Sequence, residues 1–286
     1  MNVKMHNEII QTWKLQELEN CIDEFEDFIC ERVNGKVPGT PSLDNSFLHI
    51  AGNICRLARS VLALSAVGYA ESALALTRSI YENAVVLAFF NSKISDENLN
   101  EYVADYYLAG EYRYLKSQRQ TYEKIGDLKQ ENDINKKMKE LEEKAYKRHK
   151  EIKGDYWWAG CKRFCDLENY FEKEIQEVCS GSQKEKIAFV STVAASYKIA
   201  CSILHSNSLG NASRLGELRD DSIADTGPHI NGHSVPLETV ANCLIYIFGT
   251  LYSFWGLDSS RLIERLKGLS VFYASKMREE TPSEGA

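Results

Sequence analysis

A cation, a hydroxyl and an imidazole recur at helical spacing near the end of an apolar segment. Lys198, Ser202 and His205 are four and then three residues apart, so an α-helix places them on one face. Histidine moves protons near neutral pH, and a cation stabilises charge that develops on a phosphate. Together they suffice for metal-free attack of an RNA 2′-hydroxyl on its own phosphodiester. The alternative role of a histidine at a helix C-terminus is to cap free carbonyl groups.

A second polar group lies in the apolar segment 69–91. Glu71, Arg78 and Glu82 form one stripe of a helix, and the stripe runs into residues 84–90, which are apolar on all sides. Burying a guanidinium or a carboxylate is costly unless the group is paired. We therefore expect an Arg78–Glu82 ion pair at or near a core. It either orients a guanidinium for chemistry or closes a polar hole in the bundle.

The segments SVLALSAVGYAESALALTRSIYENAVVL and SYKIACSILHSNS carry a resemblance to known proteins. They resemble an uncharacterised bacterial all-helical family with an Arg-x-x-x-Glu helix and a later Ser-x-x-His helix. That family is similar to the HEPN superfamily, whose helical bundles often dimerise and include ribonucleases of toxin and phage-defence systems. The resemblance implies a HEPN-like bundle, a homodimer and a metal-independent ribonuclease or RNA-binding effector.

The sequence departs from the HEPN pattern at one position. HEPN ribonucleases carry an arginine four to six residues ahead of the histidine. No arginine falls in that window before His205, and the position with six intervening residues is Lys198. Lysine offers a point charge where arginine offers a planar fork of donors. Arg78 supplies the missing guanidinium if its helix packs beside that of His205.

The site implied by the resemblance has two groups of residues. The catalytic group is His205, Arg78 and Glu82, with Glu82 orienting Arg78 and His205 acting as general acid and base. The substrate-binding group is Lys198, Ser202 and Asn207. The competing hypothesis is a non-catalytic helical scaffold or interaction protein, in which the same residues form a structural polar network.

Metal and cofactor sites are not expected. Asp221, Asp225, His229 and His233 recur every four residues, but intervening glycines and a proline forbid one helix. Cys161 and Cys165 lack a second pair at zinc-site spacing. The sequence also lacks a glycine-rich phosphate loop and a Gly-x-Ser-x-Gly elbow.

Composition predicts an all-α helical bundle. The 286 residues are 44% hydrophobic and include only five prolines, so long helices can form around a large core. A net charge of −7 argues against a broad phosphate-binding surface and leaves room for a local RNA contact. Eight scattered cysteines and the lack of a signal peptide predict reduced thiols and a cytoplasmic location. The one candidate membrane span, residues 240–257, is interpreted as a buried core helix, so no membrane is expected.

We predict four regions along the chain. Residues 1–96 and 156–278 form the bundle, 97–155 a protruding polar hairpin, and 279–286 a disordered tail. The hairpin breaks at 126–127 or 132–133, and is either a solvated arm or a site for a partner protein. Helices are expected over residues 8–33, 45–66, 69–91, 164–178, 184–205 and 237–277, the last with a break at 256–259.

Overall fold

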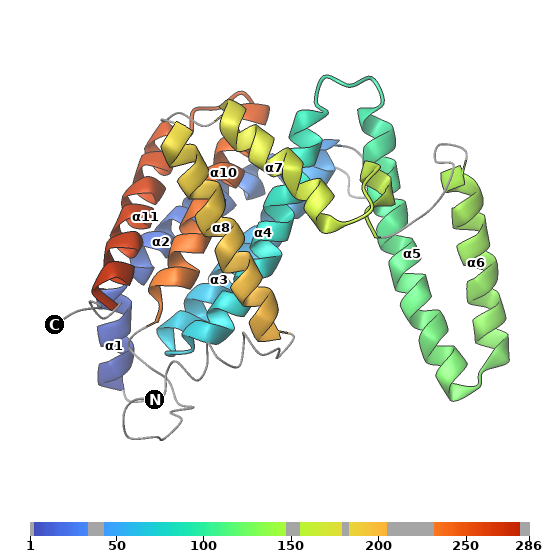
Figure 1. The fold of residues 1–286 in the computed structure, drawn as a ribbon, viewed down its shortest axis with the longest axis horizontal. Coiled ribbons are helices and arrows are strands. Elements are labelled where there is room, and N and C mark those ends of the chain that lie inside the picture. The colour runs from blue at the N-terminus through green and yellow to red at the C-terminus, as the bar shows by residue number, and fades with distance from the viewer. Residues whose placement is uncertain (1–2, 34–42, 147–154, 179–182, 205–231, 281–286) are drawn as a thin grey trace. The chain divides into compact units, whose positions relative to one another are not determined.

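The computed structural model describes residues 3–33, 43–146, 155–178, 183–204 and 232–280. Within these ranges every regular element is a helix and there is no strand (Figure 1). The all-α class predicted from composition is therefore confirmed.

The helices follow the chain in this order: α1 (Val3–Thr12), α2 (Leu15–Val33), α3 (Leu43–Ala66), α4 (Ala70–Ser92), α5 (Leu99–Ile125), α6 (Leu128–Tyr146), η1 (Trp157–Ala159), α7 (Phe164–Val178), α8 (Gln183–Leu204), α10 (Ser234–Phe254) and α11 (Ser260–Glu280). Their ends lie close to the predicted ones, apart from the first helix. α11 also runs on through Glu280, where the sequence predicted a frayed tail from residue 279.

The chain divides into two compact units. The first unit comprises Met1–Lys36, Phe47–Ala84 and Ile175–Ala286, and the second comprises Val37–Ser46 and Val85–Glu174. Each unit has its own buried side chains.

The first helix of the first unit is broken, in contrast to the single helix predicted over residues 8–33. α1 ends at Thr12, α2 begins at Leu15, and Lys14 between them has a φ of 49°. Trp13 and Leu15 are both buried, with Trp13 edge-on to the His233 ring at 5.7 Å between centroids. In one straight helix these two residues would point about 200° apart. The turn at Lys14 lets both side chains enter the core.

The centre of the first unit is α10, which is buried along most of its length. Phe248 on α10 stacks on Phe25 of α2, with 3.7 Å between ring centroids. Towards α11, the buried Asn242 accepts a hydrogen bond from Ser270 Oγ at 2.7 Å. α10 thus contacts helices from both ends of the chain.

A cluster of charges joins α2 to α3 in the same unit. The guanidinium of Arg59 on α3 lies 2.6 Å from Asp23, 3.8 Å from Glu19 and in contact with Glu26, all on α2. The hydrogen bond to Glu26 is the main reason that the pKa of Arg59 is raised. The acidic face of α2 is thereby neutralised where it meets α3.

In the second unit, aromatic side chains form the core. The buried Trp158 of η1 lies against Phe89, Phe90 and Tyr106, with centroids 5.1, 5.7 and 4.9 Å away. Trp158 is thus enclosed by rings from three other positions in the chain.

α5 and α6 of the second unit fold back on each other. They bury a small core of Leu115, Ile134, Met138 and Leu141. Gly126 ends α5 in the left-handed region with a φ of 75°, and the Asp127 carboxylate accepts a hydrogen bond from the backbone N–H of Gln130 in α6. The helix break therefore falls at the first of the two predicted positions.

Three helices in the described part of the chain are long and apolar enough to cross a membrane, by length and composition. They are α3, α4 and α10, where the sequence had indicated one segment, 240–257. Neighbouring residues bury 50%, 61% and 83% of their apolar windows, respectively. α10 in particular has most of its apolar surface covered within the fold.

Candidate functional site

The predicted Arg78–Glu82 pair is present on α4, one turn apart. Arg78 Nε donates to Glu82 Oε1 at 2.8 Å, and the two side chains are 28% and 32% exposed. The pKa of Arg78 is raised, mainly by this hydrogen bond. The pair therefore reaches water, although Val85 and Phe89 further along α4 are fully buried.

Tyr197 of α8 lies against this ion pair. Its hydroxyl is 3.4 Å from Glu82 Oε1, and its ring centroid is 6.0 Å from Arg78 Cζ. The ring also packs on Tyr81 at 4.9 Å between centroids. Burial is the main reason that the pKa of Tyr197 is raised, so the phenol stays protonated and can donate a hydrogen bond.

Apolar contacts hold α4 and α8 together beside the pair. Leu74 of α4 and Ala200 of α8 are buried against each other, with Ile199 and Val235 packed around them. This contact lies one turn from Arg78 on α4 and close to Tyr197 on α8. It is the element pairing that brings a guanidinium to α8.

Lys198 and Ser202 do not share an environment, although their spacing places them near one face. The Lys198 side chain is exposed, whereas Ser202 is 7% exposed. Ser202 Oγ donates to the Lys198 carbonyl oxygen at 3.0 Å, within α8 itself. The hydroxyl proton of Ser202 is thus used in a backbone hydrogen bond, and Lys198 faces solvent.

His205 and Asn207 lie outside the described residues. The last described residue of α8 is Leu204, whose side chain is 52% exposed. Of the six predicted site residues, the structure therefore brings together Arg78 and Glu82, and places Lys198 and Ser202 on the adjoining helix.

Sequence reasoning missed Tyr197 and Cys201, which face Arg78 from α8. Cys201 is close enough to contribute to the raised pKa of Arg78 and to hydrogen-bond with Tyr197. The available signal was the spacing, because Tyr197, Cys201 and His205 follow at intervals of four residues. Lys198 was predicted because it is charged. The face of α8 that meets Arg78 instead carries Tyr197 and Cys201.

The metal ligands considered in the sequence do not come together in the described part of the chain. No group of three or more His, Cys, Asp or Glu side chains there could hold a metal ion. His233 is fully buried and packs on Trp13. Asp221, Asp225 and His229 lie outside the described ranges.

The arrangement presents a guanidinium and a phenol together at a partly exposed position. Glu82 accepts from Arg78 Nε and so sets the direction of the guanidinium plane. Arginine binds phosphate through parallel N–H donors. The Tyr197 hydroxyl donates its proton to Glu82 and so helps to fix the carboxylate that orients Arg78. The guanidinium can bind an anion and stabilise charge that develops on it.

Comparisons with known proteins bear on this site. Neither the curated proteins nor the solved structures gave a match. The sequence does match a family of unknown function (DUF5677) over residues 44–223, a range that includes α4 and α8. The relationship to the HEPN superfamily stays a prediction. Since the match covers more than half of the chain and both helices of the site, the chain belongs to the DUF5677 family of unknown function.

Proposed function

We propose that this chain is a HEPN-like RNA-cleaving effector of a bacterial toxin or phage-defence system, acting without a metal ion. The observation that carries the proposal is the partly exposed guanidinium of Arg78, oriented by Glu82 and flanked by Tyr197 of α8. In the sequence, α8 leads directly into His205.

In the proposed reaction the RNA 2′-oxygen attacks the adjacent phosphorus and the bond to the 5′-oxygen breaks. His205 takes the proton of the 2′-hydroxyl as general base and then supplies it to the leaving 5′-oxygen as general acid. Arg78 stabilises the negative charge on the phosphoryl oxygens, and Glu82 holds Arg78 in place. The products are a 2′,3′-cyclic phosphate and a 5′-hydroxyl.

The substrate-binding roles are divided among the remaining residues. Lys198, which is exposed, attracts the phosphate backbone. Asn207 binds a phosphate oxygen. Ser202 does not take this role, because it already donates its proton to the Lys198 carbonyl oxygen. Tyr197 adds a hydroxyl near Glu82.

A non-catalytic scaffold is the second candidate function. It is favoured by the way the described polar groups bond to one another: Arg78 to Glu82, Tyr197 to Glu82, and Ser202 to its own helix. Such a network can specify helix packing without performing chemistry.

The proposal also takes the protein to be a cytoplasmic homodimer whose α5–α6 pair protrudes and can meet a protein partner. The burial of most of the apolar window of α10 supports a location away from the membrane. The small separate core of α5 and α6 supports a projecting hairpin.

The test uses purified protein, total RNA and a 5′-labelled single-stranded oligonucleotide, all with a metal chelator. We expect the wild type to give fragments ending in 2′,3′-cyclic phosphate. His205→Ala and Arg78→Ala should lower the cleavage rate by about 100-fold or more. The matched control is Arg163→Ala, which removes another arginine–carboxylate pair, with Asp166 at the start of α7. It should cleave like the wild type.

Two results would contradict the proposal. Identical RNA profiles for wild type and His205→Ala reject the nuclease and favour the scaffold. Loss of cleavage on chelation alone rejects the metal-independent mechanism.

A further inference from the structure

The distal part of the α5–α6 pair is basic, although the chain as a whole is acidic. Residues 113–139 contain eight basic and four acidic side chains, a net charge of +4 in a chain of net charge −7. The basic residues are Arg113, Lys116, Arg119, Lys124, Lys129, Lys136, Lys137 and Lys139. All but the half-buried Arg119 are exposed. We call residues 113–139 the α5–α6 basic surface.

The cations of this surface outnumber its carboxylates by eight to four. None of the eight forms an ion pair with another residue in the described ranges. This contrasts with Arg59 and Arg265, which meet the acidic side chains of α2. The uncompensated charge creates a local positive potential that attracts anions.

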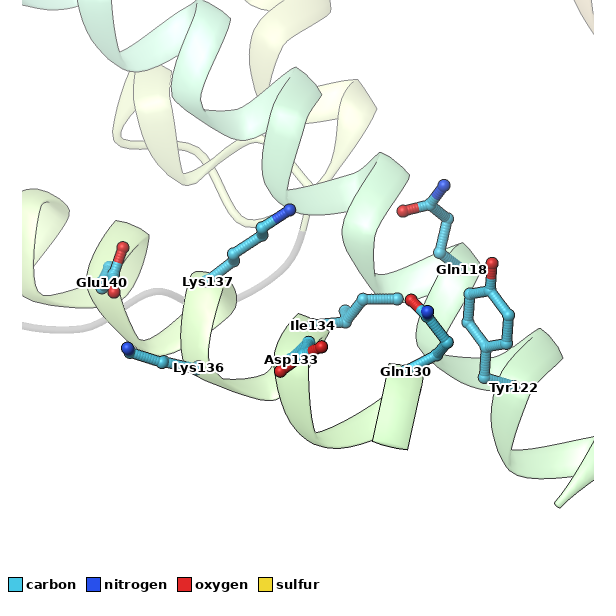
Figure 2. Close-up of a pocket in the computed structure, with 8 residues that line it drawn as sticks. All are labelled: Gln118, Tyr122, Gln130, Asp133, Ile134, Lys136, Lys137 and Glu140. Atoms are coloured by element: carbon cyan, nitrogen blue, oxygen red, sulfur yellow. The ribbon is translucent and has the colours of Figure 1, made fainter. Parts of the chain in front are cut away.

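A polar cavity opens on the same surface, with a volume of about 510 Å³. Gln118 and Tyr122 line it from α5, and six residues line it from α6: Gln130, Asp133, Ile134, Lys136, Lys137 and Glu140 (Figure 2). Figure 2 shows Lys137 extending from α6 towards α5. The cavity thus combines two ammonium groups with two carboxylates, two side-chain amides, a phenol ring and an isoleucine side chain.

These groups match the chemistry of single-stranded RNA. Ammonium groups bind the phosphates, amides can hydrogen-bond base edges, and an aromatic ring offers a face on which an unpaired base can stack. A lipid surface would require apolar side chains instead, and the exposed Ile125 and Leu128 at the turn offer two. Ile125 and Leu128 do not line the polar cavity, which favours RNA.

We infer that the α5–α6 basic surface binds single-stranded RNA, with Lys136 and Lys137 contacting its phosphates. This inference rests on the proposed function, since it takes RNA as the ligand of the protein. It assigns a further RNA contact to the α5–α6 basic surface, in addition to those of Lys198 and Asn207, and leaves cleavage to Arg78 and His205.

The experiment measures binding of a fluorescent single-stranded RNA to the full-length protein by anisotropy, across a series of salt concentrations. The variant is Lys136→Gln with Lys137→Gln, and the matched control is Arg261→Gln with Lys267→Gln, two exposed cations on α11. For single strands each phosphate contact contributes about −0.7 to the slope of log K against log salt. We expect the slope of the variant to be less negative by about 1.4. We also expect the variant to bind about 25-fold more weakly at 0.1 M salt. The control should bind like the wild type.

The outcomes separate this inference from the proposed function. Weak binding by the Lys136/Lys137 variant but wild-type binding by the Arg261/Lys267 control supports the inference, even if no protein cleaves RNA. Cleavage by the wild type with unchanged binding by the Lys136/Lys137 variant overturns the inference and leaves the proposed function standing. Absence of RNA binding by the wild type overturns both.

Two further measurements address other ligands of the same surface. One is sedimentation with vesicles of phosphatidylserine and phosphatidylcholine, using an Ile125→Ser, Leu128→Ser variant. Vesicle binding that needs these two residues, without RNA binding, overturns the inference in favour of a membrane surface. The other is the oligomeric state of the Lys136/Lys137 variant by ultracentrifugation. If the variant forms an assembly of different mass but binds RNA like the wild type, the inference is overturned. The surface is then a contact between copies of the chain.

Discussion

Arg78 is positioned more by its neighbours than by burial. Its guanidinium is bonded to Glu82 and lies beside Tyr197, yet more than a quarter of the side chain reaches solvent. Ion pairs with this exposure are screened by water and contribute little to folding. A functional role for Arg78 would therefore affect activity far more than stability.

The first prediction concerns the stability of an Arg78→Ala variant. Because the pair is partly exposed, we expect the free energy of unfolding to fall by less than about 1 kcal/mol. Urea denaturation followed by circular dichroism measures the change. A double-mutant cycle with Glu82→Gln should give a coupling energy of the same small size. A loss above about 3 kcal/mol would instead identify the pair as a buried structural strut.

At the scale of elements, the end of α5 depends on a left-handed residue. Gly126 has a φ of 75°, and a Cβ at this position would meet no atom within 4 Å, so only the backbone conformation opposes a side chain. Gly110 lies within α5 with an ordinary helical conformation and equally open surroundings. The two glycines form a matched pair that differs in backbone conformation.

The second prediction follows from this pair. Gly126→Ala should lower the stability of the α5–α6 pair by about 1 kcal/mol, since alanine is strained at positive φ. Gly110→Ala should raise it by about 0.5–1 kcal/mol, because alanine favours the helix. Hydrogen exchange of the α5 and α6 amides measures both. Equal effects of the two substitutions would contradict the assignment of a left-handed helix end.

Most helix boundaries could be predicted from the sequence because turn residues determine them locally. Gly126 and Gly256 both adopt positive φ where a break was expected. The break at Lys14 could not be predicted, since it depends on the burial of Trp13 and Leu15 against other helices. The site shows the same division: the Arg78–Glu82 spacing predicts the pair, whereas the rotation of α8 that presents Tyr197 depends on the Leu74–Ala200 contact.

At the scale of the whole molecule, buried thiols are distributed through the core. Burial raises the pKa of Cys55 to about 12 and that of Cys243 to about 12, from an ordinary value of 9.0. In the folded chain these thiols stay protonated at pH values where the unfolded chain releases their protons. Their contribution to stability is therefore complete below pH 9 and is lost as the pH rises towards 12.

The third prediction is alkaline sensitivity. The free energy of unfolding should fall above about pH 9, by up to about 1.4 kcal/mol per pH unit for each of the two thiols. Cys243→Ala should be less stable at every pH, because it leaves a cavity, but its stability should fall less steeply above pH 9. Cys30→Ala, at an exposed cysteine, is the control and should keep the wild-type slope. Urea titrations between pH 7 and pH 11 measure the slopes, and equal slopes for Cys243→Ala and wild type would contradict the prediction.

The hydrogen bond between Ser270 and Asn242 has a consequence for how the last two helices assemble. If α11 slid along α10 by one turn, about 5.4 Å, the apolar side chains could still find partners, but the Asn242 amide would be left unsatisfied among them. An unsatisfied buried polar group costs about 1–3 kcal/mol. One amide and one hydroxyl thus select a single alignment of the two helices. Their apolar surfaces alone would permit several alignments.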